Sequence, residues 1–310
     1  MLQLPIRSRK RPAKMKSIPT VDAHHHIWRL SDLPWLSGPQ VPRIFGPYQP
    51  ICRDYVISEY RDDIEGCDIV KSIYVQTNWP AGRSFDEAQW VQSTADATGW
   101  PQASVAHADL ADRDAGALLA RLAKLPTVRG IRQQLHWHEN PQYRFAARPD
   151  IMNDADWRRG LSRLADHGLL FELQVFASQM ADGARLARSF PATIFVLEHA
   201  GMQEDNSPRG LKLWREGMAA LAQCPNVNVK LSGLSTFVHA CRDDVVGPTV
   251  RETVAMFGPE RCCYGSNFPI EKLWTDYGTL YQTFRNAIAD LGENAQAAIL
   301  HDTAARLYRL

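Results

Sequence analysis

The sequence predicts an α/β protein whose single domain is a (β/α)8 TIM barrel. Short runs rich in Val, Ile, Leu and Phe recur eight times along the 310 residues, and most are followed by a polar turn and a stretch with helical spacing. The runs are apolar on both faces, which is typical of parallel strands covered by helices. They span residues 20–26, 69–77, 102–108, 128–135, 169–175, 193–199, 227–232 and 262–267.

Amphipathic helices are expected between the strands, at residues 86–98, 114–124, 154–167, 178–189, 208–223 and 245–257. Several of these stretches begin with Asp or Ser, which cap a helix by accepting its free amide hydrogens. An open doubly wound sheet is the alternative fold, but no GxGxxG turn follows the first strand. The segment from Leu33 to Pro50 holds five prolines and two glycines, so we expect a long non-helical loop there. In a barrel such a loop falls on the catalytic rim and can act as a lid.

The composition favours a small-molecule partner. The 35 basic and 34 acidic residues give a formal charge of +1, which indicates neither a nucleic acid nor a membrane surface. Six cysteines without a CxxC pair fit reduced thiols in a cytoplasmic protein. Oligomeric state is left open, although barrels of this size often form homo-oligomers.

The chain is expected to divide into a disordered basic tail, residues 1–17, and a barrel domain, residues 18–310. The first sixteen residues hold six Lys or Arg and lack the apolar run of a secretory signal. Met15 is an alternative start, because the ordered pattern begins at about Ile18.

The stretch VDAHHHIW places three consecutive histidines, residues 24–26, on the first strand. Side chains on a strand alternate, so His24 and His26 share a face with Asp22, while His25 points to the helices. At the carboxyl end of a barrel strand, two such imidazoles can bind one metal ion. The alternative is a set of core histidines that hydrogen-bond to backbone carbonyls.

Polar side chains also mark other strands. His199 closes the sixth strand and is expected to point inward, opposite to Glu198. Arg132 on the fourth strand can project inward and anchor a carboxylate or a carbonyl. Glu172 on the fifth strand and Lys230 on the seventh either serve the site or form a buried network that holds the barrel together.

An ordered set of motifs resembles the amidohydrolase superfamily, in its amidohydrolase 2 branch. The set runs from DAHHHIW and PWL through IYVQT, RGIRQ, FELQVFASQM, VLEHAG and PNVNVKLSGL to RCCYGSNFPIEKL, between about Thr20 and Leu310. That branch includes sugar lactonases of the fuconolactonase and rhamnonolactonase type, a pyrone dicarboxylate hydrolase and, more distantly, nonoxidative decarboxylases. The resemblance implies a metal-dependent hydrolase on a TIM barrel.

The resemblance implies metal ligands at His24, His26 and His199. The superfamily's bridging Lys on strand four and His on strand five have no match, because Arg132 and Gln174 stand on those strands. We therefore expect one divalent ion, zinc in the first place, with manganese as the alternative and with weak binding or absence left open.

Further residues are expected on the substrate side. Gln174 belongs to this group, and Gln76 and Trp79 follow at the end of the second strand. A second HxH, His136 and His138 in LHWHEN, lies in a loop, so we expect His138 at the rim or against the substrate rather than in a second metal site.

The eighth strand departs from the superfamily pattern. Asn267 in GSNFP stands where the superfamily has an Asp that binds the metal and takes the proton from water. A carboxamide has no charge and no useful basicity, so it cannot be the general base. Glu271, Glu172 and Asp205 are the candidates for that role.

Three functions are compatible with these residues. The leading hypothesis is a hydrolase that opens a small lactone, or a related ester or amide, with Arg132 and Lys230 steadying an acid group or the oxyanion. A metal-dependent decarboxylase is the second. The third is a ligand-binding barrel that lost catalysis when Asn267 arose.

Overall fold

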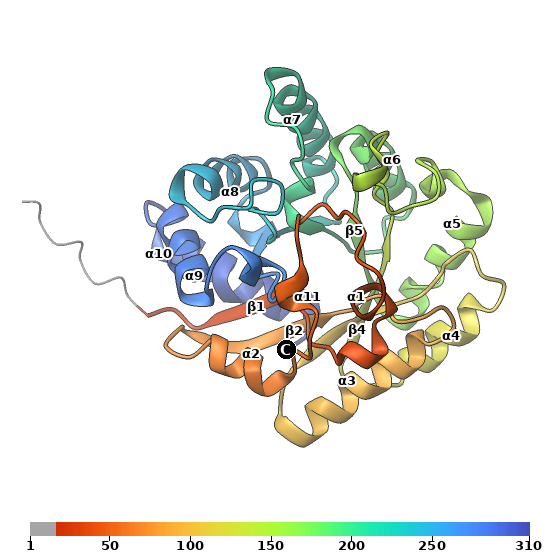
Figure 1. Ribbon diagram of the computed structural model, residues 1–310. Helices are drawn as coiled ribbons and strands as arrows, with labels where there is room; N and C mark the ends of the chain where they lie inside the picture. The colour runs from red at the N-terminus through yellow and green to blue at the C-terminus, as the bar shows by residue number, and fades with distance from the viewer. Residues whose placement is uncertain (1–16) are drawn as a thin grey trace, which may run out of the picture.

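The computed structural model describes residues 17–310 and shows a barrel of eight parallel strands surrounded by helices (Figure 1). Neighbouring strands pair in sequence order from β1 to β8. They are β1 (Thr20–His25), β2 (Ile69–Val75), β3 (Ala103–His107), β4 (Val128–Gln134), β5 (Leu170–Gln174), β6 (Phe195–Leu197), β7 (Val227–Leu231) and β8 (Cys262–Tyr264). The predicted fold and all eight strands are confirmed. The expected basic tail lies outside the described residues, apart from Ser17.

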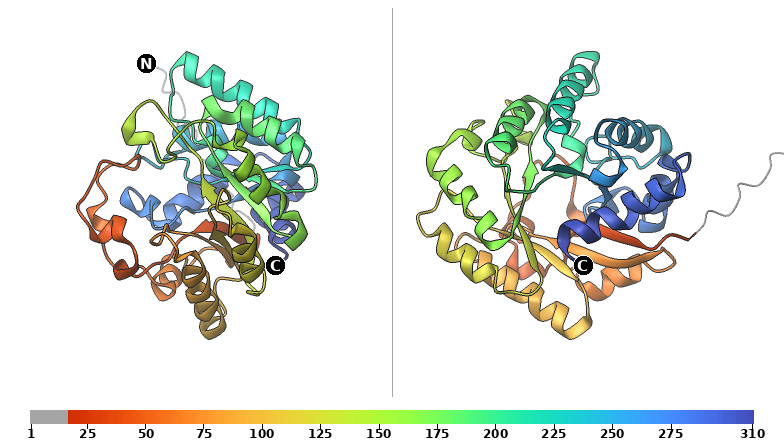
Figure 2. Two further views of the ribbon diagram at one scale, coloured as in Figure 1. Left: turned by 90° about the vertical axis from the view of Figure 1, so that its right-hand side faces the viewer. Right: turned by 180° about the vertical axis from the view of Figure 1, so that it is seen from behind.

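Most of the helices form the outer layer of the barrel (Figure 2). They are α1 (Pro34–Ser37), α2 (Ile57–Asp63), α3 (Ser84–Thr98), α4 (Ala115–Leu122), α5 (Ala155–Ser162), α6 (Met180–Ser189), α7 (Pro208–Ala222), α8 (Asp243–Phe257), α9 (Tyr277–Ala287), α10 (Glu293–Ala297) and α11 (Thr303–Tyr308). The six predicted helices correspond to α3 to α8. Asp154 caps α5 as expected, because its side chain accepts the amide hydrogens of Asp156 and Trp157.

The segment from Leu33 to Pro50 lies at the barrel rim, as predicted, but it is not wholly non-helical. Its first residues form the single turn of α1, which begins at Pro34 and ends before Gly38. Proline suits the first position of a helix because its missing amide hydrogen would have no partner there. The proline content limits the helix to one turn rather than excluding it.

The first strand is irregular, and this irregularity corrects the predicted orientation of Asp22. Val21 and Ala23 pack inside the barrel with apolar side chains of other strands, so Asp22 points outward. The pairing register with β2 then shifts between Asp22 and His25. His24 therefore turns inward and His25 outward, where the ring of His25 stacks on Tyr60 with 3.9 Å between centroids.

Asp22 instead joins β1 to two outer helices. Its carboxylate accepts hydrogen bonds from the hydroxyls of Tyr60 in α2 and Tyr277 in α9, both at 2.9 Å. It also accepts from the backbone amide and the hydroxyl of Ser266, at 2.8 and 2.6 Å, and from the amide of His24. Burial raises the pKa of Asp22, and the bonds from Ser266 oppose that shift.

The barrel closes through the backbone that follows β8. The amide of Asn267 donates to the carbonyl of His24, and the amide of His26 donates to the carbonyl of Phe268, both at 2.7 Å. These bonds fix the end of β1 against the loop that carries Asn267.

The C-terminal helix α11 crosses the amino-terminal end of the barrel (Figure 2). The Tyr308 hydroxyl reaches Glu172 at 2.6 Å, and Lys230 binds the same carboxylate at 2.5 Å. Glu172 and Lys230 are both fully buried. The buried network that the sequence left as an alternative is thus present beneath the site.

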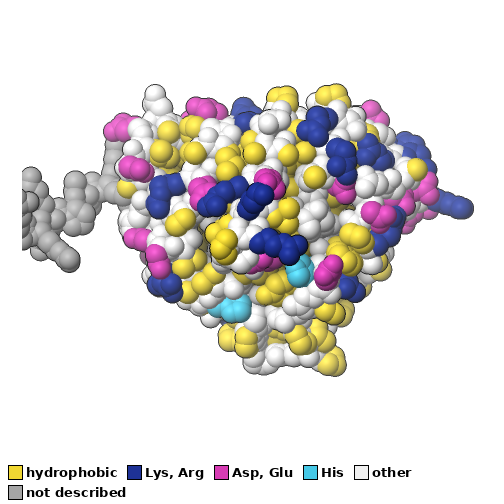
Figure 3. Space-filling view, turned by 90° about the horizontal axis from the view of Figure 1, so that it is seen from above, with side chains coloured by type: hydrophobic (Ala, Val, Ile, Leu, Met, Phe, Trp, Pro, Cys, Tyr) yellow, Lys and Arg dark blue, Asp and Glu magenta, His cyan; other side chains and the backbone are white. Residues whose placement is uncertain are grey.

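The surface carries both signs of charge. On the face seen in Figure 3, Lys and Arg side chains are interspersed with Asp and Glu, in agreement with the formal charge of +1. Among residues 17–310, no helix combines the length and the apolar character needed to cross a membrane.

Helix α5 packs so closely on the β3 side of the barrel that Gly160 leaves no room for a side chain. A Cβ atom there would lie 2.0 Å from the backbone oxygen of Leu110. We expect Gly160→Ala to lower the free energy of unfolding by about 1–3 kcal/mol through overpacking, measured by urea denaturation. Gly278→Ala is the control, since its Cβ meets only an ordinary contact at 3.4 Å. Equal stability of the two variants would contradict this packing.

Candidate active site

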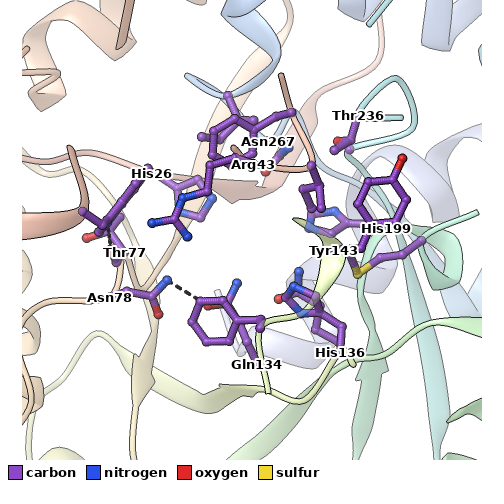
Figure 4. A pocket seen from close by; sticks show the side chains of 18 of the residues that line it. His26, Arg43, Thr77, Asn78, Gln134, His136, Tyr143, His199, Thr236 and Asn267 are labelled. Atoms are coloured by element: carbon purple, nitrogen blue, oxygen red, sulfur yellow. Dashed lines mark hydrogen bonds between the residues drawn. The ribbon is translucent and has the colours of Figure 1, made fainter. Parts of the chain in front are cut away.

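A cavity opens at the carboxyl ends of the strands, beneath the segment from Leu33 to Pro50 (Figure 4). Its floor includes His26, Arg132, His199 and Asn267. The walls and roof carry several aromatic side chains, namely Trp28, Trp35, Phe45, Tyr143, Phe145 and Phe237. Chain segments that are far apart in sequence therefore meet around one space, as barrel geometry predicts.

The three predicted histidine ligands lie together. The ring centroid of His24 is 5.0 Å from that of His26 and 4.7 Å from that of His199. His24 is fully buried and both of its ring nitrogens lack a hydrogen-bond partner. His26 Nδ1 lies 2.7 Å from the carbonyl of Val75, so Nδ1 carries the hydrogen and Nε2 is left unprotonated.

Glu198 faces the site as well, which corrects the prediction that it points away from His199. Strand β6 ends at Leu197, and His199 has left-handed backbone angles, φ 55° and ψ 36°. Alternation therefore stops before this pair, and both side chains turn toward the interior. A Cβ on Gly233 would lie 2.6 Å from His199 Nδ1, so only glycine leaves room for this ring.

Glu198 provides the negative charge that three neutral histidines lack. One carboxylate oxygen lies 3.5 Å from His24 Nδ1, and the other lies 3.9 Å from His199 Nε2. Arg132 binds the same carboxylate at 3.0 Å, with both side chains almost fully buried. Glu198 could have been found from the sequence, because a divalent ion bound by neutral histidines needs an anionic ligand and Glu198 directly precedes the predicted ligand His199.

Burial and the nearby cations keep the histidines neutral. Burial, with help from Lys230, lowers the pKa of His24 well below its usual value. Burial and Arg132 lower the pKa of His26 and of His199 to about 3. Burial is the largest influence on Glu198 and would raise its pKa, but Arg132, Glu172 and Lys230 together outweigh burial and the net shift is downward. The site thus presents uncharged imidazoles beside a carboxylate.

These residues suit a divalent cation. His24, Glu198 and His199 each offer a ligand atom, and these atoms all lie within 4.8 Å of one another. Neutral imidazole and carboxylate are zinc ligands, and the unbonded buried nitrogens of His24 are costly unless they are used. His26, the third predicted ligand, lies beside this cluster but not within it.

Asn267 sits at the edge of the cavity with a left-handed backbone, φ 58°. Its backbone carbonyl accepts the amide hydrogen of Glu271 at 3.3 Å, and its side chain lies near those of His26 and Glu271. Glu271 is fully buried behind it and also accepts hydrogen bonds from Trp274 Nε1 at 2.9 Å and from the Thr236 hydroxyl at 3.4 Å. Burial raises the pKa of Glu271 to about 7, although these bonds lower it.

The other predicted residues divide into two groups. Gln76 and Gln174 line the cavity, as expected of substrate-side residues. Trp79 does not line it and packs against Trp90 and Arg83. His138 lies behind the wall, where it contacts Tyr143 and Phe176, and its neighbour His136 lines the cavity instead.

Lys230 and the three candidate bases are not among the residues that line the cavity. Lys230 and Glu172 bind each other beneath it. Asp205 accepts a hydrogen bond from the amide of Ser207 at the start of α7. Of the three carboxylates, Glu271 alone contacts Asn267 and Thr236, which line the cavity.

A family model described as amidohydrolase matches residues 21–310. The chain belongs to the amidohydrolase family. The family predicted from the ordered motifs is therefore confirmed, and the match covers the whole barrel.

Among the relatives of this amidohydrolase, the uncharacterized protein y4mH of Sinorhizobium fredii is 34% identical over 96% of this chain and 100% of its own length. An L-fucono-1,5-lactonase of Burkholderia ambifaria is 28% identical, over 94% of this chain and 95% of its own. An amidohydrolase of Burkholderia multivorans, solved with bound zinc, has a TM-score of 0.79 and 26% identity, over 94% of this chain and 99% of its own.

A metal-content measurement tests the His24, Glu198 and His199 cluster. We expect protein purified without added metal to retain about one divalent ion per chain, and His24→Ala and Glu198→Gln to lose most of it, as measured by mass spectrometry of the metals. His138→Ala is the control, because His138 lies outside the cavity. Full metal content in both cluster variants, with folding verified by circular dichroism, would contradict the site.

Proposed function

We propose that this amidohydrolase hydrolyses a small lactone. The observation that supports it most directly is the meeting of His24, Glu198 and His199 beside a cavity lined by hydrogen-bonding and aromatic side chains. The similarity to L-fucono-1,5-lactonases along nearly the whole chain supports the choice of a cyclic ester. A divalent ion bound at the cluster would polarise the ester carbonyl and acidify a water molecule.

Arg132 is suited to stabilise the charge that develops on the carbonyl oxygen. Its two terminal nitrogens are engaged, one by Glu198 and the other by the carbonyl of Gln76. Its Nε is buried and has no partner, while the residue lines the cavity. In this proposal, the unpaired N–H of a guanidinium that two fixed partners hold in place donates to the oxyanion.

Glu271 is the base in this proposal, acting through Thr236. The Thr236 hydroxyl lines the cavity and donates to the Glu271 carboxylate. As water attacks the carbonyl carbon, its proton passes to the Thr236 oxygen while the hydroxyl proton moves to Glu271. The bond between the carbonyl carbon and the ring oxygen then breaks. Glu271 gives its proton back to Thr236, and Thr236 protonates the leaving ring oxygen. Asn267 stands where the superfamily has an Asp, and in this proposal it positions Glu271 instead of taking the proton itself.

The decarboxylase alternative has less support. The 2,6-dihydroxybenzoate decarboxylase of Rhizobium is 15% identical to this chain, with a TM-score of 0.62, and this likeness shows the fold alone.

Assay of a panel of five- and six-membered sugar lactones by pH indicator tests the proposal. We expect turnover by the wild type, and a loss of about 100- to 1,000-fold in kcat/KM for Arg132→Met, because one oxyanion donor is removed. His138→Ala should match the wild type. Release of carbon dioxide from aromatic acids without lactone turnover would contradict the proposal and indicate a decarboxylase. Binding of lactones without any turnover would indicate a non-catalytic barrel.

The pH dependence tests Glu271. A base must be ionised, and the pKa of about 7 at Glu271 makes kcat/KM rise through neutral pH and level off above it. We expect Glu271→Gln to lose about 100- to 10,000-fold in kcat/KM and to lose this rise. Asp205→Asn, which removes an exposed carboxylate, should keep both the rate and the profile. An unchanged profile in Glu271→Gln would assign the proton transfer to another group.

A further inference from the structure

Among the described residues, the lining of the cavity includes basic side chains but no acidic ones. Three arginines line it, Arg43, Arg132 and Arg144, and no Asp or Glu of residues 17–310 is among the lining residues. A concave, aromatic-walled space with this imbalance attracts anions. A neutral polyhydroxylated ring would find amides and hydroxyls there, but no carboxylate to accept from its hydroxyl groups.

Two of these three guanidinium groups are already engaged. Arg132 binds Glu198 and the carbonyl of Gln76. Arg144 donates to the carbonyls of His138 and Glu139 and lies over the ring of Trp137.

Arg43 differs from both of them. Within residues 17–310 its guanidinium makes no hydrogen bond or ion pair, and its Nε is buried without a partner. Its one described side-chain contact is with the ring of Trp35, 5.5 Å from the centroid. Figure 4 shows the guanidinium directed into the open centre of the cavity, on the side of His26.

The backbone around Arg43 is held from two other loops. Gln142, after β4, donates to the carbonyl of Arg43 at 3.1 Å. His239, after β7, lies 3.3 Å from the carbonyl of Ile44, and its ring packs so closely on Gly46 that a Cβ would lie 2.9 Å away. The backbone at Arg43 is therefore fixed, while its guanidinium is left without a hydrogen-bond or ion-pair partner in the described fold and is available to a ligand.

We propose that the lactone carries a carboxylate and that Arg43 binds it, which makes Arg43 the residue that selects acidic lactones over neutral ones. This inference rests on the proposed function, which supplies the lactone ring, and adds to it a carboxylate substituent. One unpaired guanidinium matches the single charge and planar shape of a carboxylate, whereas a phosphate carries nearly two charges.

A matched pair of substrates tests the inference. The two 1,5-lactones share ring and stereochemistry, but one has a carboxylate at C5 and the other has a hydroxymethyl group. We expect the wild type to prefer the acidic lactone, and Arg43→Gln to raise its KM by about 10- to 100-fold with little change in kcat or in the neutral lactone's kinetics. A phosphomethyl analogue distinguishes the anions, and its preference over the carboxylate would overturn the assignment.

Arg53→Gln is the control, because Arg53 is an exposed arginine just beyond the same segment and is paired with Glu59. It changes the net charge equally and should leave both substrates unaffected. An equal wild-type rate on the two lactones, or a preference that survives in Arg43→Gln, would overturn the inference.

A binding measurement separates this inference from the proposed function. Glutarate and its monomethyl ester differ by one charge at one end, and calorimetry compares their affinities without turnover. We expect tighter binding of glutarate by the wild type and loss of that difference in Arg43→Gln. If no lactone is hydrolysed but this difference is seen, the proposed reaction fails while the anion site stands. Equal affinities in the wild type would refute the anion site whatever the reaction.

Discussion

The two backbone hydrogen bonds between the end of β1 and the loop after β8 are the constraint on which the site depends. They link His24 to Asn267 and His26 to Phe268, and they join the first and last strands of the sheet. Closing a sheet brings the carboxyl ends of distant strands to one rim. Without this closure, the imidazoles at the end of β1 would not meet Glu198 and His199, which follow β6.

Two buried carboxylates of the barrel interior lie at different heights, and each is paired with a cation. At the amino-terminal end, Glu172 is compensated by Lys230 and hydrogen-bonded by Tyr308. Above it, Glu198 is compensated by Arg132 and lies beside His24 and His199. Buried charges persist only when paired and hydrogen-bonded, and each carboxylate here has such a partner. The uncompensated cation, Arg43, is found only where the cavity opens.

The fold could be predicted because apolar runs and helical periods repeat along the whole chain. Which side chains line the cavity could be predicted where strands are regular, as for Arg132 and Gln174. Alternation failed for Asp22, where the register of β1 shifts, and for Glu198, which follows the last residue of β6. The roles of Trp79 and His138 depended on loops, whose course depends on tertiary packing that periodicity does not encode.

Asp22 connects the outer helices to the strand that carries the histidines of the site. One carboxylate receives hydroxyls from α2 and α9, on two sides of β1, and also holds the backbone amides of His24 and Ser266. The two helices therefore cannot shift independently without disturbing the strand between them. Divergence among related chains should be coupled at these two tyrosines, although both stand outside the barrel and neither reaches the substrate.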